Sequence, residues 1–416
     1  MSERSSGSSQ EVRLRRPSDL RGEGGRRARR GSRADGSALS WPERFAESER
    51  DRSALIVLLH LASLTPRRLL ELAQERRTAA HCLEAVLGGE TASESDRALA
   101  GSVRPDEARR ALEPSGARFI AVGDPDYPPE LLDLFDPPAG LFVRGSPLQG
   151  LSPRVAMVGA RNCSPSGRDV AATLARALAL AGACVVSGGA RGIDAAAHRG
   201  ALRAGGRTIS VLGCGIDILY PGQNRSLLQE IAGAGAIVSE YPPGTPAEPF
   251  RFPARNRIVA ALCRAVVVVE GARGSGSMIT ADHALDVGRE VFAVPGAVSS
   301  PLAAVPLELI RDGATLVRGP ADLVGDLGWS VTTADSDALA MGAGARPGGG
   351  SSFGRSLSAS ERAVWSALTV AMAPDALAGA AAMPLPEVMS ALVGLELRGK
   401  VRQIGGRYER RLEGSA

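Results

Sequence analysis

The feature that most constrains this fold is a series of short apolar, β-rich runs between residues 154 and 317. Segments that read as helices separate most of them, such as GRDVAATLARALALAG (167–182) and IDAAAHRGALRAGG (193–206). The runs are RVAMVG, ACVVSGG, RTISVLG, AIVSE, AVVVVEG, EVFAVPG and ATLV. Continuous apolar strands that alternate with helices form parallel sheets covered on both faces. We therefore predict an α/β fold with a doubly wound parallel sheet as the main domain, over residues 117–325.

Different patterns flank this domain on both sides. Residues 43–116 have helical periodicity, and SLTPRR (63–68) breaks one apolar run as a helix–turn–helix would. Residues 357–412 predict three short helices and a hairpin around Gly405 and Gly406, which together make a winged helix. Ser358 or Ser360 would cap the first of these helices, and Val388, Leu392 and Leu395 follow helical spacing. Winged helices bind DNA or proteins, and the sequence leaves both options open.

Composition separates the ordered parts from two further segments and gives a weak clue to partners. Residues 1–42, rich in Arg, Ser and Gly, predict a disordered basic tail, and residues 326–356 predict a flexible linker. The net charge is only +4, and all but one of the 49 basic residues are arginine, a bias that GC-rich codon usage explains. No apolar run has the length of a membrane span, and five scattered cysteines suit a reducing compartment. We expect a cytoplasmic protein without a membrane partner.

Four turns that follow predicted strands are rich in glycine and other small residues. Arg161, Arg191 and Arg273 lie on three of them, and helix N-termini that follow such turns favour phosphate. The chain lacks the P-loop pattern, and its first turn lacks the dinucleotide pattern, so several turns together suit a polymer backbone better than one nucleotide. The turns are GARNCSPSG (159–167), SGGARGID (187–194), GCGIDILYPGQN (213–224) and EGARGSGSMITADHA (270–284).

The segment FRFPARNRIVAAL (250–262) combines basic and aromatic residues. Arginines pair with phosphates and aromatic rings stack on bases, as sequence-tolerant binding of single strands requires. The same spacing also fits two core phenylalanines and arginines at a helix start, so the residues alone leave both interpretations open. The residues concerned are Arg251, Arg255, Arg257, Phe250 and Phe252.

Groups suited to catalysis are scarce. His198 and His283 stand outside any metal-binding pattern and without a C-x-x-C partner, which favours structural roles. Ser187, Ser275 and Ser277 lack the G-x-S-x-G turn of hydrolases. We therefore predict no catalytic residues, no metal and no cofactor.

The ordered motifs from VAMVGAR, VVSGGARGIDAAAHRGAL and ISVLGCGIDILYPGQN to FPARNRIVAAL and VVVVEGARGSGSMITADHALDVGREVFAVPG closely resemble the DNA-processing protein A (DprA/Smf) family. The resemblance implies an extended Rossmann-like domain, an N-terminal helical module (SAM or helix-hairpin-helix-like) and a C-terminal winged helix. It also implies a non-enzymatic homodimer that protects incoming single-stranded DNA and loads a RecA-type recombinase during natural transformation. The DNA-binding residues that it implies are Gly159, Arg161, Ser187, Gly188, Gly189, Arg191, Gly192, Arg255, Asn256, Arg257, Arg273, Ser275, Gly276 and Ser277.

The sequence departs from the family pattern in three places and leaves two other functions open. Gly274 stands where a basic residue usually precedes the SGS triplet, the first turn reads G-A-R, and SSPLAAVPLELI (299–310) lacks a G-T-N. One alternative is a nucleotide-processing enzyme of the lysine-decarboxylase-like or phosphoribohydrolase type, although VPGAVSS lacks the glutamate of that motif. Another is a regulator that binds duplex DNA through the winged helix.

Overall fold

The computed structural model describes residues 39–110, 112–329 and 357–411. The predicted tail lies almost wholly outside these residues, and so does most of the predicted linker. Trp41 packs on Phe45 with ring centroids 4.9 Å apart, so the described fold begins slightly before the predicted boundary. At the other boundary Leu327 is buried against the main core, which places the first residues of the predicted linker within the α/β domain.

The N-terminal module consists of five short helices. Leu55 and Leu70 are fully buried in it, as the helical periodicity predicts. The predicted break is confirmed: Thr65 accepts a hydrogen bond from the backbone N–H of Arg68, and Pro66 opens the next helix. The helices are α1 (Glu49–Leu58), α2 (Pro66–Arg76), α3 (Ala79–Leu87), α4 (Glu94–Ser102) and α5 (Pro105–Arg110).

The main domain contains a nine-stranded sheet with the order β1-β2-β6-β5-β4-β3-β7-β8-β9. Strands β3 to β9 pair in parallel, whereas β2 pairs antiparallel with both β1 and β6. All seven predicted runs form strands, which confirms the doubly wound α/β fold. The strands are β1 (Arg118–Ala121), β2 (Gly140–Gly145), β3 (Arg154–Val158), β4 (Cys184–Ser187), β5 (Thr208–Leu212), β6 (Ala236–Ser239), β7 (Ala265–Val268), β8 (Glu290–Ala293) and β9 (Thr315–Leu316).

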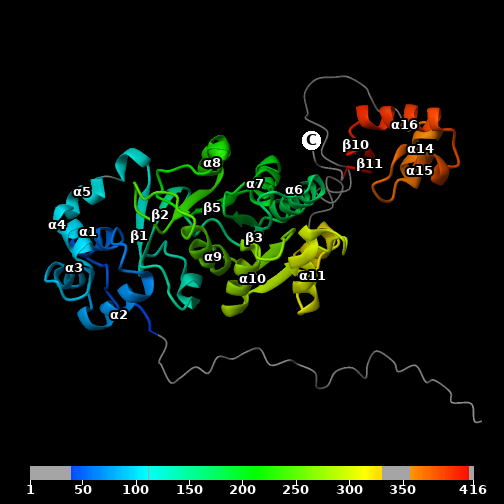
Figure 1. Cartoon of the computed structure of the whole chain (residues 1–416). Coiled ribbons are helices and arrows are strands. Elements are labelled where there is room, and N and C mark those ends of the chain that lie inside the picture. The colour runs from blue at the N-terminus through cyan, green and yellow to red at the C-terminus, as the bar shows by residue number, and fades with distance from the viewer. Residues whose placement is uncertain (1–38, 111, 330–356, 412–416) are drawn as a thin grey trace, which may run out of the picture. The chain divides into compact units, whose positions relative to one another are not determined.

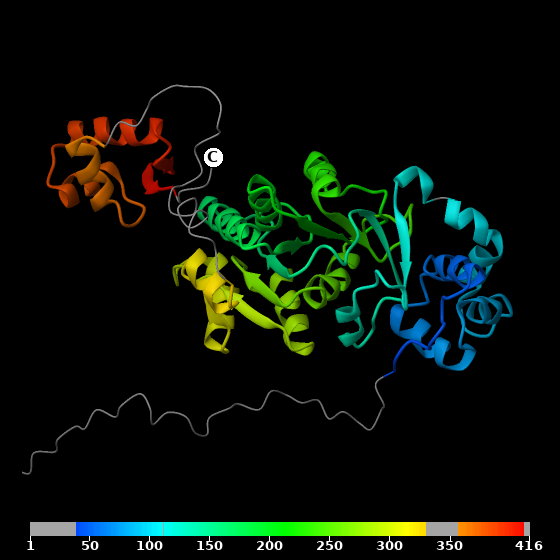
Figure 2. The same cartoon turned by 180° about the vertical axis from the view of Figure 1, so that it is seen from behind.

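Helices cover both faces of this sheet. Helices α6, α7 and α8 lie over one face and α9, α10 and α11 over the other (Figures 1 and 2). The core between α6, α7 and the strands is built from small and branched side chains such as Leu174, Val185 and Ala197. The helices are α6 (Pro165–Leu180), α7 (Ile193–Arg203), α8 (Arg225–Ala234), α9 (Arg251–Ala261), α10 (Gly276–Asp286), α11 (Ala304–Arg311) and α12 (Pro320–Asp326).

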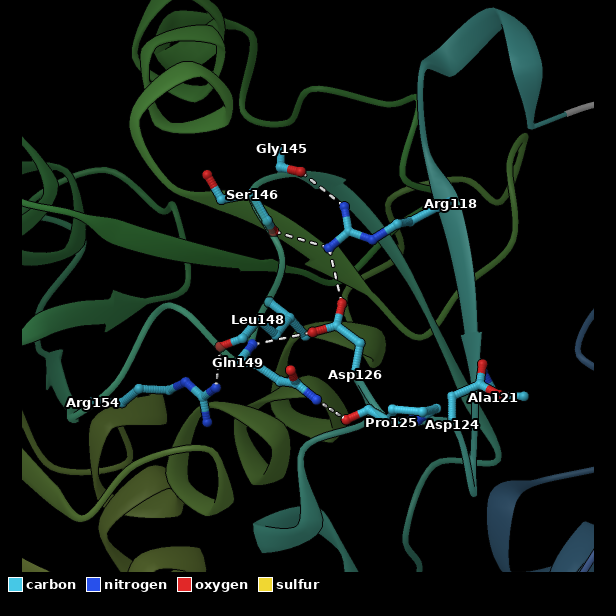
Figure 3. Close-up of polar contacts among 10 residues, drawn as sticks. All are labelled: Arg118, Ala121, Asp124, Pro125, Asp126, Gly145, Ser146, Leu148, Gln149 and Arg154. Atoms are coloured by element: carbon cyan, nitrogen blue, oxygen red, sulfur yellow. Dashed lines mark hydrogen bonds and ion pairs between the residues drawn. The ribbon is translucent and has the colours of Figure 1, made fainter.

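Polar contacts of Arg118 hold the antiparallel β1–β2 extension together (Figure 3). The Arg118 guanidinium donates to the carbonyl oxygens of Gly145 (2.8 Å) and Ser146 (2.9 Å) and to the Asp126 carboxylate (3.1 Å). The backbone N–H of Ser146 donates in turn to the carbonyl of Gly235, just before β6. The extension therefore continues the sheet beyond β6, and β4, β3 and β7 lie in the centre of the sheet.

The C-terminal unit is the predicted winged helix. Val388, Leu392 and Leu395 are fully buried in its core, and Ser358 caps the first helix in a capping box with Glu361. Its elements are α14 (Ala359–Ala367), α15 (Pro374–Ala381), α16 (Leu385–Leu397), β10 (Val401–Ile404) and β11 (Arg407–Arg410). Within the described residues no single helix could cross a membrane; α15 and most of α16 satisfy the length and composition test only together, and a bend of 105° separates them.

The strand order changes direction at β3. The chain adds β4, β5 and β6 on one side of β3 and then crosses over to add β7, β8 and β9 on the other. Ligands of doubly wound folds bind beyond the carboxyl ends of the strands at such a switch point. Here the turns 159–164, 188–192 and 269–275 meet at the ends of β3, β4 and β7; we call them the rim.

Candidate nucleic-acid interface

A cavity of about 550 Å³ opens at the rim. All three turns line it, together with the start of α9, and Arg161 and Arg255 supply its positive charge. The Asp194 carboxylate also lines it and offsets part of that charge. The cavity is therefore lined largely by backbone and small side chains, with a modest excess of guanidinium groups.

Arg255 is part of the cavity floor. It is 4% exposed, and its Nη1 donates to the carbonyl oxygens of Gly188 (2.8 Å) and Val211. These bonds tie α9 to the turn after β4 and hold the guanidinium at the base of the cavity. Burial raises the pKa of the neighbouring Asp194 carboxyl, while the Arg255 charge acts in the opposite direction. Arg255 thus stabilises the turn and also presents positive charge to a ligand.

Arg257 lies elsewhere, contrary to its predicted role as a DNA contact. It is 5% exposed and lines neither this cavity nor the smaller slot described below. Its Nη2 donates to both Glu240 oxygens (2.7 and 2.9 Å), and its Nε donates to Asp136 (3.1 Å). Removing one partner of such a buried ion pair leaves an uncompensated charge, so Arg257 supports the fold beneath the rim.

The turn SGGARGID uses its own amides differently from the sequence-based expectation. The backbone N–H groups of Gly188 and Ala190 donate to the Asp194 carboxylate at 3.1 and 3.3 Å, so these donors are already satisfied. Gly192 has a φ of 77°, and a Cβ there would lie 2.2 Å from the Ala160 carbonyl oxygen. The turn therefore shapes the rim, and its carboxylate occupies the place in which a phosphate was expected.

The N-terminus of α10 remains open. Ser275 is its N-cap residue, but no side chain accepts a hydrogen bond from the first turn of the helix. In the described part of the chain, the N–H groups of Gly276 and Ser277 have no acceptor outside the helix. The Oγ atoms of Ser275 and Ser277 are 2.6 Å apart, and both residues line the cavity. Free amides at a helix N-terminus bind anions, so this turn can hold one phosphate group.

A slot of about 60 Å³ adjoins the cavity. The rings of Tyr220 and Phe252 stack beside it with centroids 5.4 Å apart, and the Arg161 guanidinium lies 5.2 Å from the centroid of Phe252. Arg161 and Arg255 line both the slot and the cavity, and Arg191 lines the slot. A flat, unpaired base can stack on such aromatic and guanidinium surfaces.

The structure sorts the predicted site residues into two groups. Those that line the cavity or the slot are Gly159, Arg161, Gly188, Arg191, Arg255, Asn256, Ser275, Gly276 and Ser277. Those that line neither are Ser187, Gly189, Gly192, Arg257 and Arg273. Ser187 is fully buried and donates to the Met157 carbonyl, and Arg273 is exposed beside the open turn. The sequence-based list of binding residues omitted Tyr220 and Asp194. Both had a visible signal, since Tyr220 begins the YPGQN segment and Asp194 lies in the first turn of the helix after the SGGARG turn.

The side chain of His198, on the helix that follows the second turn of the rim, is closed to a ligand. His198 on α7 is fully buried, and its Nδ1 lies 2.7 Å from Thr208 Oγ1. Burial lowers the pKa of His198 to about 3, so the ring is neutral near pH 7. This agrees with the structural role that the sequence favours.

Comparison with known proteins agrees with this architecture. The family model for DNA recombination-mediator protein A matches residues 118–328, and the model for the DprA winged helix domain matches residues 354–407. Protein Smf of Escherichia coli is 35% identical over 311 residues, which are 72% of this chain and 79% of that protein. Protein Smf of Synechocystis is 43% identical over 215 residues, which are 51% of this chain but only 54% of that protein.

A solved structure gives the same result. The X-ray structure of DNA processing protein A (DprA) from Streptococcus pneumoniae aligns with a TM-score of 0.59 and 32% identity, over 67% of this chain and 98% of that one. Sequence and fold thus point in the same direction. The chain belongs to the DNA recombination-mediator protein A (DprA/Smf) family.

Proposed function

We propose that this chain binds single-stranded DNA at the rim and acts as a recombination mediator without bond-breaking chemistry of its own. One phosphate binds the open N-terminus of α10, with Arg161 and Arg255 beside it, and a neighbouring base stacks against the aromatic and guanidinium surfaces of the slot. The observation that carries the proposal is the position of Arg161, which lines both the cavity and the slot and faces the ring of Phe252.

The lining of the slot supports a single strand over a duplex. The slot of about 60 Å³ is lined by aromatic rings and guanidinium groups, and the face of one unpaired base can lie against them. Stacking on aromatic rings requires that the base has left its own stack, which costs a single strand little. The strand would continue past Arg191 and Arg273 on the exposed part of the rim.

Further steps follow from family membership and remain part of the proposal. The bound strand is protected and passed to a RecA-type recombinase during natural transformation, by a homodimer in the cytoplasm. No observation favours the alternative enzyme on small nucleotides: the buried His198 is unavailable as a base, and the VPGAVSS segment lacks the glutamate of that enzyme class.

Fluorescence anisotropy with labelled oligothymidylates of 6 to 40 nucleotides tests the proposal against matched duplexes. We expect affinity to increase with single-strand length, to exceed duplex affinity, and to decrease steeply as salt rises. A second measurement adds a limiting amount of a RecA-type recombinase and records its ATP hydrolysis on the same strands, with and without this chain. Equal affinity for single strands and duplexes would refute the binding mode, and unchanged recombinase activity would refute the loading step.

A further inference from the structure

Two of the three turns at the rim already have a carboxylate of the chain itself bound to their amides. The first turn leads into α6, which follows β3 at the switch point. In dinucleotide-binding folds the pyrophosphate lies against the N-terminus of the helix that follows the first parallel strand. Here the Glu270 carboxylate, which follows β7, accepts hydrogen bonds from the backbone N–H of Ser164 (2.8 Å) and from its Oγ (2.5 Å).

The surroundings of Glu270 are shaped for its carboxylate. A Cβ at position 167 would lie 2.3 Å from the Glu270 Cδ, so the glycine there leaves the space that the carboxylate fills. The N–H of Ala160 donates to the Glu270 carbonyl at 2.8 Å, which fixes the backbone that carries the side chain. Ser164 Oγ also accepts from the Gly167 N–H at 2.8 Å, so the first turn of α6 is capped within the fold.

Asp194, in the first turn of α7, occupies the second turn of the rim, because its carboxylate accepts from the amides of Gly188 and Ala190. The third turn, which leads into α10, has no carboxylate among its hydrogen-bond partners in the described residues. A phosphate group that approached the first two turns would meet a like charge at hydrogen-bond distance from the same amides, and such contact is repulsive. Of the three turns of the rim, only the one that leads into α10 is therefore free of a carboxylate within the described residues.

We propose that Glu270, together with Asp194, is a specificity-determining residue that excludes free nucleotides and pyrophosphate from the rim. The inference rests on the proposed single-strand binding and adds a reason why the polymer is selected. A free nucleotide has its phosphates adjacent and needs neighbouring positions for them, whereas a strand spaces single phosphates along its backbone. One open position therefore suits a polymer that gains further contacts beyond the cavity.

The experiment measures pyrophosphate and dTTP binding to the full chain by calorimetry at constant ionic strength. For the parent chain we expect no binding below millimolar concentrations. Glu270→Gln keeps the length of the side chain and an acceptor for Ser164 but removes the charge, and we expect at least a tenfold gain in pyrophosphate affinity. Ser164→Ala is the matched control: it removes the hydroxyl but keeps the Glu270 charge, and no gain is expected.

Several outcomes would overturn the inference. Submillimolar pyrophosphate binding by the parent chain would do so whatever the variants show, even if Glu270→Gln failed to fold. A folded Glu270→Gln protein, judged by its melting temperature, with no gain over Ser164→Ala would also do so. Failure of the parent to bind oligothymidylate would instead refute the proposed function, and the pyrophosphate titrations would still report on Glu270 by themselves.

Discussion

At the rim of the α/β domain a ligand meets guanidinium and amide groups, whereas on the outer face of α16 it meets aliphatic side chains. Leu385, Met389 and Val393, at intervals of four residues, are 40%, 38% and 49% exposed. Glu387 and Glu396 are exposed on the same helix, and residues 385–396 contain no Lys or Arg. In winged helices that bind DNA, the helix that corresponds to α16 enters the major groove, where it needs hydrogen-bond donors and positive charge.

The difference between these two surfaces separates nucleic-acid contact from protein contact, which the sequence alone could not assign to different elements. The winged helix could be a duplex reader or a protein-contact module from its pattern alone, and the composition of α16 favours the second. The rim has the chemistry for a polyanion. Contact with nucleic acid and contact with proteins are therefore best tested on different elements of the chain.

The largest expected effect comes from closing the open N-terminus at the rim. Ser275→Asp would place a carboxylate at the start of α10, as Glu270 and Asp194 do at the other two turns. Loss of the charge-assisted hydrogen bonds to one phosphate costs about 1.5–3 kcal/mol of binding free energy, so oligothymidylate affinity should fall about 10- to 100-fold. Stability should stay equal or rise by about 0.5 kcal/mol, because Asp is a good N-cap and favours the helix dipole.

Ser275→Asn is the matched control for that variant. It has the size of Asp without the charge, and we expect it to lower affinity by less than threefold. Anisotropy titrations and urea unfolding measure the two quantities side by side. An equal loss of affinity in the Asn and Asp variants would mean that the size of the side chain at position 275, and not its negative charge at the N-terminus of α10, lowers the affinity.

The aromatic slot should give the next largest effect. Phe252→Leu keeps an apolar side chain against Gly213, which the ring approaches closely, but removes the stacking surface. Stacking of a base on an aromatic ring contributes about 1–3 kcal/mol, and we expect about a tenfold loss of single-strand affinity. Phe252→Trp should retain parent affinity, and an unchanged affinity in the Leu variant would remove the slot from the binding mode.

The strands and helices of the α/β domain could be predicted from the sequence. Each strand is apolar at consecutive positions, as a strand buried on both faces must be. The two arginines of RNR show where this kind of prediction stops. Residues two apart on a helix point about 200° apart, since each residue turns the helix by about 100°. Arg255 therefore faces the cavity while Arg257 faces Glu240, and the spacing alone could have excluded a shared role.

Other features of the site depend on contacts that no local pattern contains. Glu270 meets Ser164 across 106 positions of the chain, and it does so because β7 lies beside β3 in the sheet. Tyr220 stacks on Phe252 in the same way, from a loop after β5 to the second residue of α9. The sequence predicted that the glycine turns lie at the carboxyl ends of the strands. The side chains that meet at these turns, such as Glu270 with Ser164, are brought together by the strand order.

A smaller effect is expected from Arg161, one of the exposed arginines of the rim. Arg161→Ala should lower oligothymidylate affinity about five- to tenfold, because the exposed Arg161 side chain lies against the Phe252 ring and makes no hydrogen bond or ion pair within the described residues. The slope of log affinity against log salt should fall by about one unit, as for one released phosphate contact. Arg264→Ala is the control, since Arg264 precedes β7 and lies at the opposite edge of the sheet. Equal salt slopes for the two variants would contradict a phosphate contact at Arg161.

The smallest expected effect tests the other half of the comparison. Met389→Glu with Val393→Glu adds two negative charges to the face of α16, where they would repel a DNA backbone. We expect single-strand affinity to change by less than twofold, since the rim carries the contact, and duplex binding to stay as weak as in the parent. Met389→Gln with Val393→Gln controls for loss of the apolar surface. A severalfold loss of DNA affinity in the Glu pair alone would place α16 against nucleic acid, because only a nearby polyanion distinguishes two added carboxylates from two added amides.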